Sequence, residues 1–103
     1  MIDQKTQILN IAVNLNRIGN WAADGFDNRK KRIETFVDQT SDYVKEVDKS
    51  KLKNSFKKTF LTFLKNWGKL KRMEKIQNEL LWAEKMMTWG NILTHRAKLL
   101  KKS

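Results

Sequence analysis

One stretch decides the fold class: residues 33–47 read IETFVDQTSDYVKEV. Its core-type side chains recur every three or four residues, at Ile33, Phe36, Val37, Thr40, Tyr43, Val44 and Val47. That spacing places them on one side of an α-helix, whereas a half-buried β-strand would need strict alternation of apolar and polar residues. The stretch therefore predicts an amphipathic helix with one buried face.

Three further stretches show the same helical period, and residues that interrupt helices are scarce. The chain has no proline and only four glycines. The first stripe follows Asp3, a candidate N-cap, and consists of Ile8, Ile11, Ala12, Leu15, Ile18, Gly19 and Ala22. The third consists of Leu52, Phe56, Phe60, Phe63, Leu64 and Trp67, and the fourth of Met73, Ile76, Leu80, Ala83 and Met87.

Short connections force consecutive helices to pack antiparallel. We therefore expect an all-α fold, an antiparallel four-helix bundle, with a C-terminal helix longer than the other three. The expected helices span residues of about 3–23, 28–47, 51–67 and 69–100.

The connections themselves are predicted from turn and cap residues. The pair Asp24-Gly25 suggests that the first helix ends in a left-handed residue. The next two helices have candidate side-chain caps at Asp27 or Asn28 and at Asp48 or Ser50.

Two glycines of the second half are interpreted differently. At about 100° per residue, the apolar stripes of residues 52–67 and 73–87 differ in direction by well over a quarter turn, which predicts a helix break at or near Gly68. The apolar rows cross Gly90 without such a shift. Gly90 is therefore expected inside the last helix, where it allows close backbone approach.

The length and composition limit the class of protein. A chain of 103 residues has room for one domain, here residues 1–103. The absence of cysteine excludes disulfides and thiolate chemistry. There is no secretory signal pattern at the N-terminus and no run of about 20 apolar residues that could span a membrane. We expect a cytoplasmic protein.

The charge is concentrated in the second half of the chain. Residues 1–48 hold 7 Lys and Arg against 8 Asp and Glu, whereas residues 49–103 hold 15 against 3. The net charge of +11 is thus carried by the second half. Such a half either attracts an external polyanion or is partly neutralised within the molecule.

No catalytic, metal or cofactor motif is present. The single histidine, His95, has no second ligand beside it and is interpreted as a cation near a helix C-terminus. Glu34, Asp38 and Asp42 form a row along the second helix, which we expect to be solvated or salt-bridged, within the chain or with another subunit. We expect a non-enzymatic protein without a cofactor.

Two groups of cations are candidates for binding an anion or a nucleic acid. The cluster Arg29, Lys30, Lys31 and Arg32 opens the second helix, where cations oppose the helix dipole and favour a compensating anion. The other group is spread over the third and fourth helices and includes Lys53, Lys57, Lys58, Lys65, Lys69 and Arg72. No known motif for reading bases accompanies them. These residues predict phosphate contacts that do not depend on sequence.

The last helix also has more apolar residues than one buried face requires. A second apolar row consists of Trp82, Met86, Trp89, Leu93 and Leu100, and the first helix has off-stripe residues at Leu9, Val13 and Trp21. Tryptophan and methionine are favoured at protein interfaces. These residues predict a protein interface, most simply a homodimer. The alternative is that the last helix is central in the monomer, or that the first and last helices cover each other's second face.

Two functional hypotheses follow from the sequence. The first is an oligomerising module for protein interactions with a basic surface, whose partner is a second copy or another protein. The alternative is a small basic protein that binds nucleic acid through its phosphates.

Overall fold

A computed structural model gives the structure of residues 3–100, which form four α-helices and no strand. Short 3₁₀ turns lie in the three connections, at Asp27–Arg29, Lys49–Lys51 and Met73–Lys75. The helices are α1 (Gln4–Gly25), α2 (Lys30–Glu46), α3 (Asn54–Leu70) and α4 (Glu79–Lys98). The predicted all-α class is confirmed.

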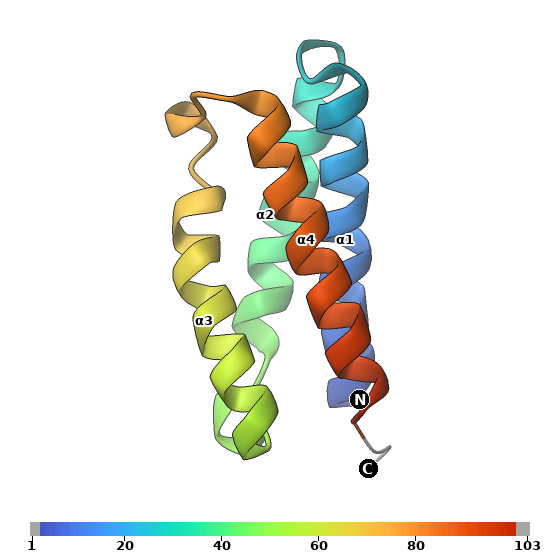
Figure 1. The fold of residues 1–103 in the computed structure, drawn as a ribbon, viewed down its shortest axis with the longest axis vertical. Coiled ribbons are helices and arrows are strands. Elements are labelled where there is room, and N and C mark those ends of the chain that lie inside the picture. Colours follow the sequence, from blue (N-terminus) through green and yellow to red (C-terminus); the bar gives the residue numbers. More distant parts are fainter. Residues whose placement is uncertain (1–2, 101–103) are drawn as a thin grey trace.

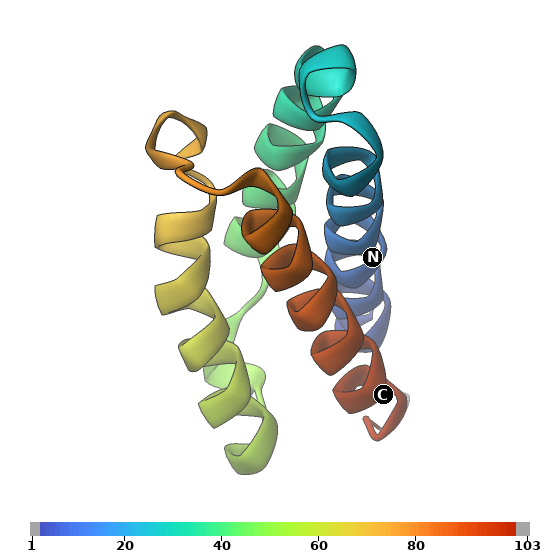
Figure 2. The ribbon, with the colours of Figure 1, turned by 45° about the horizontal axis from the view of Figure 1, so that its top comes forward.

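Consecutive helices run in opposite directions, so the fold is an antiparallel four-helix bundle (Figure 1). The molecule is elongated along the helices and measures 41 × 23 × 20 Å. In both views α4 runs between α3 on one side and α1 on the other (Figure 2). The closest helix pair is α1 with α4, followed by α1 with α2.

Small residues allow α1 and α4 to approach each other. Buried small residues recur every seventh position, which keeps them on one helix face: Ala12 and Gly19 on α1, and Ala83, Gly90 and Ala97 on α4. A Cβ atom at Gly19 would lie 2.8 Å from the carbonyl oxygen of Ala83 and would also collide with the Met87 side chain. The backbone of α4 therefore occupies the space that a larger residue on α1 would need.

Gly90 lies inside α4 and is buried, as the sequence predicted. A Cβ atom there would lie 2.6 Å from Nδ2 of Asn16. The close neighbour is therefore a side chain of α1, whose amide donates a hydrogen bond to the Ala12 carbonyl at 3.2 Å.

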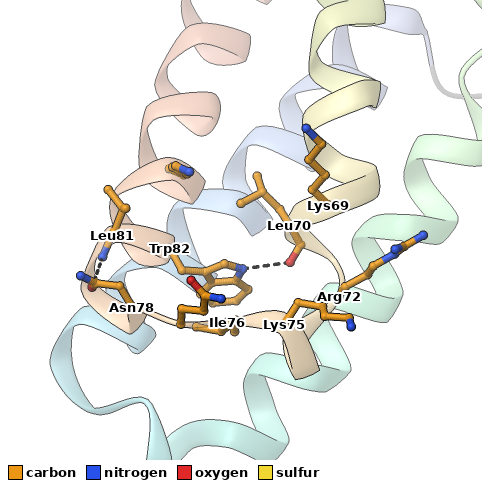
Figure 3. Close-up of a pocket in the computed structure, with 10 residues that line it drawn as sticks. Lys69, Leu70, Arg72, Lys75, Ile76, Asn78, Leu81 and Trp82 are labelled. Atoms are coloured by element: carbon orange, nitrogen blue, oxygen red, sulfur yellow. Dashed lines mark hydrogen bonds between the residues drawn. The ribbon is translucent and has the colours of Figure 1, made fainter.

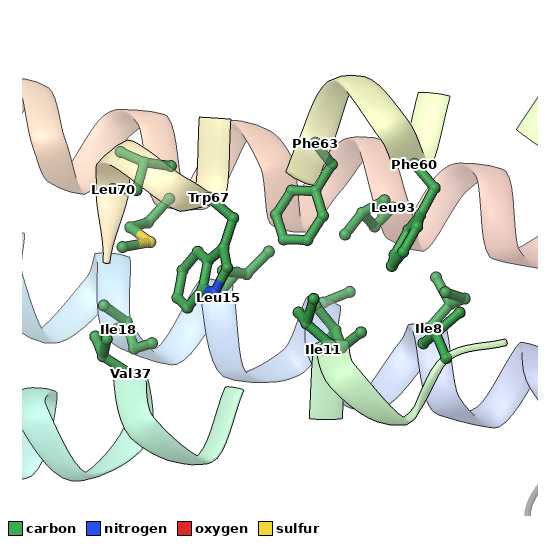
Figure 4. Packing of buried hydrophobic residues seen from close by; sticks show 14 of the residues in the cluster. Ile8, Ile11, Leu15, Ile18, Val37, Phe60, Phe63, Trp67, Leu70 and Leu93 are labelled. Carbon is green, nitrogen blue, oxygen red and sulfur yellow. The ribbon is translucent and has the colours of Figure 1, made fainter. Parts of the chain in front are cut away.

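The helix α3 packs through large aromatic side chains, in contrast to the small residues between α1 and α4. Phe56, Phe60, Phe63 and Trp67 are buried, with neighbouring ring centroids 5.7–6.0 Å apart. The rings of Phe60, Phe63 and Trp67 point into the interior, toward Ile11, Leu15 and Leu93 (Figure 4). Because these side chains are large, α3 stands farther from its neighbours than α1 and α4 do from each other.

Polar groups connect α2 to the helices on either side. Nε1 of Trp67 on α3 donates a hydrogen bond to Oγ of Ser41 at 3.2 Å. Nδ2 of Asn14 on α1 donates to Oε1 of Gln39 at 3.0 Å. The predicted stripe of α2 faces this interior, with Ile33, Val37, Thr40 and Val44 buried.

The end of α1 differs from the prediction. Asp3 is the N-cap of α1 as expected, since its Oδ1 accepts a hydrogen bond from the Thr6 amide at 2.8 Å. The left-handed stop at Asp24-Gly25 is wrong, because Gly25 is helical and no glycine in residues 3–100 has a positive φ. The chain turns instead at buried Phe26, whose ring packs edge-on against Trp82 at 5.7 Å.

The starts of α2 and α3 also differ from the prediction. Asp27 and Asn28 lie in a 3₁₀ turn, and Arg29 precedes α2 without a side-chain cap. The Asp48 carboxylate accepts hydrogen bonds from Oγ of Ser50 at 2.6 Å and from its amide at 3.0 Å. These two bonds hold the pKa of Asp48 below its ordinary value. They fix a 3₁₀ turn, so α3 begins at Asn54.

The predicted break near Gly68 exists, but it lies after Leu70. Residues 71–78 form the connection, with Met73 and Ile76 packed against the core from outside any α-helix. Asn78 begins α4 by accepting a hydrogen bond from the Leu81 amide at 2.9 Å. The expected long C-terminal helix is therefore wrong, since α4 has 20 residues against 22 in α1.

Substituting alanine at two glycines tests the close helix contact. Gly19→Ala should destabilise the protein by about 1–2 kcal/mol, because overpacking against the Ala83 carbonyl outweighs the gain in helix propensity. Gly68→Ala is the matched control in α3, where the added Cβ meets nothing within 4 Å, and should stabilise the protein by about 0.5–1 kcal/mol. Urea unfolding followed by circular dichroism measures both. A Gly19→Ala protein as stable as the Gly68→Ala protein would contradict the contact.

Candidate functional site

The second apolar row of α4 lies inside the molecule. Trp82, Met86 and Leu93 are buried, and Trp89 and Leu100 are half-buried against the core. The expectation that this row forms an exposed interface is corrected, because α4 lies between α1 and α3 and uses both faces in the monomer. The large residues face α3 and the interior, as the Trp89 ring does at 5.4 Å from Phe63. The alternative that the last helix is central in the monomer is the one observed.

The residues expected as the core stripe of α4 are less buried than predicted. Ala83 is buried, but Leu80 is 59% exposed and Met87 is only half-buried. The row predicted to be the core stripe is thus the less buried of the two rows on α4. A row of small residues contributes little hydrophobicity, although it marks the closest helix contact.

The three off-stripe residues of α1 do not form one surface. Leu9 and Trp21 are half-buried and pack against the core. Trp21 meets the ring of Phe36 edge-on at 4.8 Å, and the Arg32 guanidinium lies 5.3 Å from its ring centroid. Only Val13 is exposed, at 45%. The predicted interface residues are thus mostly occupied within the single chain.

The predicted cations at the start of α2 divide into paired and unpaired residues. Arg29 forms an ion pair with Asp24, with 2.6 Å between its Nη1 and Oδ2 of the carboxylate. Arg32 covers the Trp21 ring, while Lys30 and Lys31 are exposed and have no carboxylate within 4 Å among residues 3–100. A hollow of about 600 Å³ lies here, lined by Asn28, Arg29, Lys31, Arg32 and Thr35.

The predicted cations of α3 lie on its outer face. Lys58, Lys65 and Lys69 are exposed, and Lys57 is half-buried at the edge of this face. Lys53 is exposed and immediately precedes the helix. No aspartate or glutamate occurs in α3. This helix therefore presents positive charge to solvent with no negative charge of its own.

The carboxylate row of α2 does not neutralise these lysines directly. Glu34, Asp38 and Asp42 are exposed, and no cation of the described residues lies within 4 Å of them. Lys30 and Lys71 share with Glu34 and Asp38 the lining of a hollow of about 370 Å³. The expected ion pairing within the chain is therefore not observed among the described residues.

A pocket that the sequence did not predict lies where α3 meets α4 (Figure 3). It has a volume of about 310 Å³ and is lined by Lys69, Leu70, Arg72, Lys75, Ile76, Gln77, Asn78, Leu81, Trp82 and Lys85. Nε1 of Trp82 donates a hydrogen bond to the Leu70 carbonyl at 2.9 Å. Because the last carbonyls of a helix lack partners within it, this bond satisfies the end of α3.

Sequence reasoning missed this pocket because residues 71–78 were assigned to a helix. Arg72 was predicted as an anion-contacting residue, but Lys75 and Lys85 were counted only as general charge. The signal that was available is Asn78, an N-cap residue directly before the apolar run of α4.

Within residues 3–100, no three His, Cys, Asp or Glu residues come together as a metal site would require. His95 is exposed in the last turn of α4, at the helix end predicted for it. None of the described helices combines the length and hydropathy of a membrane span. No protein-family model, curated protein or solved structure gives a significant match to this chain.

The hydrogen bond from Trp82 can be tested by removing its donor. Trp82→Phe keeps an aromatic ring but leaves the Leu70 carbonyl without its partner, so we expect a loss of stability of about 1–3 kcal/mol. The control is Trp89→Phe, because the indole of Trp89 makes ring contacts but no hydrogen bond within the described residues. Urea unfolding of both variants measures the difference. Equal losses would show that the bond contributes little.

Proposed function

We propose that this protein has a binding role without catalysis, in which the outer face of α3 contacts the phosphates of a nucleic acid without reading its sequence. The observation that supports this most directly is the composition of α3. It carries four lysines and no acidic residue over 17 positions. Lysine contacts phosphates as a mobile point charge, which suits binding that does not depend on base identity.

The spacing of these lysines matches an extended contact. Lys58, Lys65 and Lys69 are separated by seven and four residues, so they lie along one side of the helix. At about 1.5 Å per residue the row extends over about 16 Å. A DNA duplex carries about one negative charge per 1.7 Å of its axis, so a row of this length spans several phosphates.

Weak internal neutralisation also favours an external anion. Among the lysines and arginines of residues 3–100, only Arg29 and Lys51 lie within 4 Å of a carboxylate. The pair of Lys51 and Asp48 is wide, at 4.0 Å, and solvent-exposed. Such a pair contributes little, so most of the positive charge remains available to a partner.

The test is binding to random-sequence duplex DNA at several salt concentrations. We expect the affinity to fall steeply between about 50 and 200 mM salt. Lys58→Gln/Lys65→Gln should reduce the slope of log K against log salt by about 1.8, since each lost phosphate contact removes about 0.9. Fluorescence anisotropy of labelled DNA gives the slope.

The matched control is Arg17→Gln/Lys98→Gln, which removes the same charge from exposed positions on α1 and α4. It should leave the slope nearly unchanged. No binding at 50 mM salt would overturn the proposal, and an equal change in both double variants would remove α3 as its contact surface.

Self-association, or docking of another protein, is a second candidate function. The buried residues Trp82, Met86 and Leu93 do not support self-association, because they are not available to a partner. The observation that favours it is the exposure of two adjacent leucines in the first turn of α4, Leu80 at 59% and Leu81 at 48%. Adjacent exposed leucines favour contact with an apolar partner.

Light scattering tests self-association. If the leucines form a dimer contact, the protein should have the mass of a dimer at about 100 μM, a concentration well above a micromolar dissociation constant. Leu80→Asp should then give a monomer, while Val13→Asp, at an exposed position on α1, should not. A wild-type monomer at this concentration would remove the hypothesis.

A further inference from the structure

The pocket between α3 and α4 combines an apolar floor with a basic rim. Its apolar residues come from three consecutive elements: Leu70 ends α3, Ile76 lies in the connection, and Leu81 and Trp82 belong to the first turn of α4. Figure 3 shows these side chains around one hollow. At about 310 Å³ the pocket lies at the lower end of the range typical of small-molecule sites, roughly 300–1,000 Å³.

Four cations surround this floor, and no carboxylate lines the pocket. Two of them have a structural explanation, because Lys69 lies in the last turn of α3 and Arg72 follows the helix by two residues, where the helix dipole favours positive charge. Lys75 and Lys85 have no such explanation. Lys85 lies in the second turn of α4, toward the end of the helix where the dipole disfavours a cation. Their arrangement favours an anion at the rim.

The four apolar residues of the floor offer no free hydrogen-bonding side chain to a ligand, and the polar amides that line the pocket belong to Gln77 and Asn78. The indole N–H of Trp82 is bonded to the Leu70 carbonyl, and the Oδ1 atom of Asn78 is bonded to the Leu81 amide. A hydrated inorganic anion would therefore contact the cations and these amides and leave the apolar floor uncovered. The part of a ligand that enters the floor must be apolar, because a polar group there would lose its hydrogen bonds to water.

The pocket is held open by contacts within the protein. Trp82 is fixed by its hydrogen bond to the end of α3 and by the edge-on contact with Phe26 at 5.7 Å. Asn78 fixes the first turn of α4. A ligand would therefore meet a site that is already formed, which lowers the entropic cost of binding.

We propose that this pocket binds an organic anion with a short apolar group. The phosphate or carboxylate head lies among Arg72, Lys75 and Lys85, and the apolar group covers Ile76 and Leu81. This site shares Lys69 with the nucleic-acid surface proposed for α3, but the residues assigned to the head and to the apolar group lie outside that surface. A soluble amphipathic anion and an anionic lipid share this chemistry.

The experiment is a titration of the intact protein followed by NMR, observing the four tryptophan indole N–H signals. Hexyl phosphate should shift the Trp82 signal with a dissociation constant of about 1 mM or below. Inorganic phosphate and hexanol should each bind at least about tenfold more weakly, because the first lacks the apolar chain and the second lacks the anionic head. Phosphatidylcholine vesicles with and without phosphatidylglycerol form a second arm, read by co-sedimentation.

Two matched variants assign the response to the pocket. Lys75→Gln/Lys85→Gln should weaken hexyl phosphate binding at least about tenfold, whereas Lys58→Gln/Lys65→Gln, with the same charge change outside the pocket, should alter it less than about twofold. Leu81→Asn, at a half-exposed position, should weaken binding of hexyl phosphate but not of inorganic phosphate. The dispersed indole signals report that each variant is folded.

Every outcome decides the proposal. A response to hexyl phosphate that follows this variant pattern supports a soluble ligand, and the same pattern only with anionic vesicles supports a lipid. The proposal is overturned if neither arm responds, if hexyl phosphate binds no better than inorganic phosphate, or if both lysine pairs matter equally. No arm contains nucleic acid, so the result is independent of the function proposed for α3.

Discussion

At Gly19, α1 comes so close to α4 that a single methyl group would meet the Ala83 carbonyl, and the rest of the bundle is arranged around this contact. Close approach needs small residues on both helices, which the seven-residue repeats of alanine and glycine supply. The bulky residues of α4 are consequently turned toward α3. There they meet phenylalanine and tryptophan, which hold α3 at a larger distance.

The use of small residues between α1 and α4, and of large residues between α4 and α3, explains the surface as well as the core. Because α4 buries two faces inside one chain, its tryptophans and methionines leave little apolar area for a partner. The helix α3 contributes one face to the interior and turns its lysines outward. The connection from α3 to α4 then brings four cations around an apolar floor. At this connection, positive charge and apolar surface therefore line the same pocket.

The sequence predicted those elements in which hydrophobicity and geometry agree. The helices α2 and α3 each have a single apolar stripe, which runs from Ile33 to Val44 on α2 and is aromatic on α3. The face that each helix turns toward the core was therefore unambiguous. On α4 both rows are apolar, and periodicity cannot tell which neighbour each row faces. Gly25 misled, because it is helical and costs only about 1 kcal/mol there, whereas the break that the stripe directions predicted at or near Gly68 exists and lies after Leu70.

The candidate site was less predictable than the fold. The exposure of individual lysines on α3 followed from the opposite stripe of phenylalanines. The pocket did not, because it depends on a connection whose 3₁₀ turn lies within the range predicted as helix. Its rim combines residues that are up to 16 positions apart, Lys69 and Lys85. Only the observed turn at residues 71–78 brings them around one hollow.

The pairing of α1 with α4 also has a consequence for the order of folding. These helices are the first and last of the four in sequence, so their contact closes the longest loop in the bundle and carries the largest entropy cost. During synthesis, Ala12 and Gly19 remain uncovered until the ribosome has released residues near Ala83. Until then a nascent chain can form α1, α2 and α3 but lacks the helix that separates α1 from α3. The closest helix contact of the bundle therefore cannot form before α4 has been synthesised.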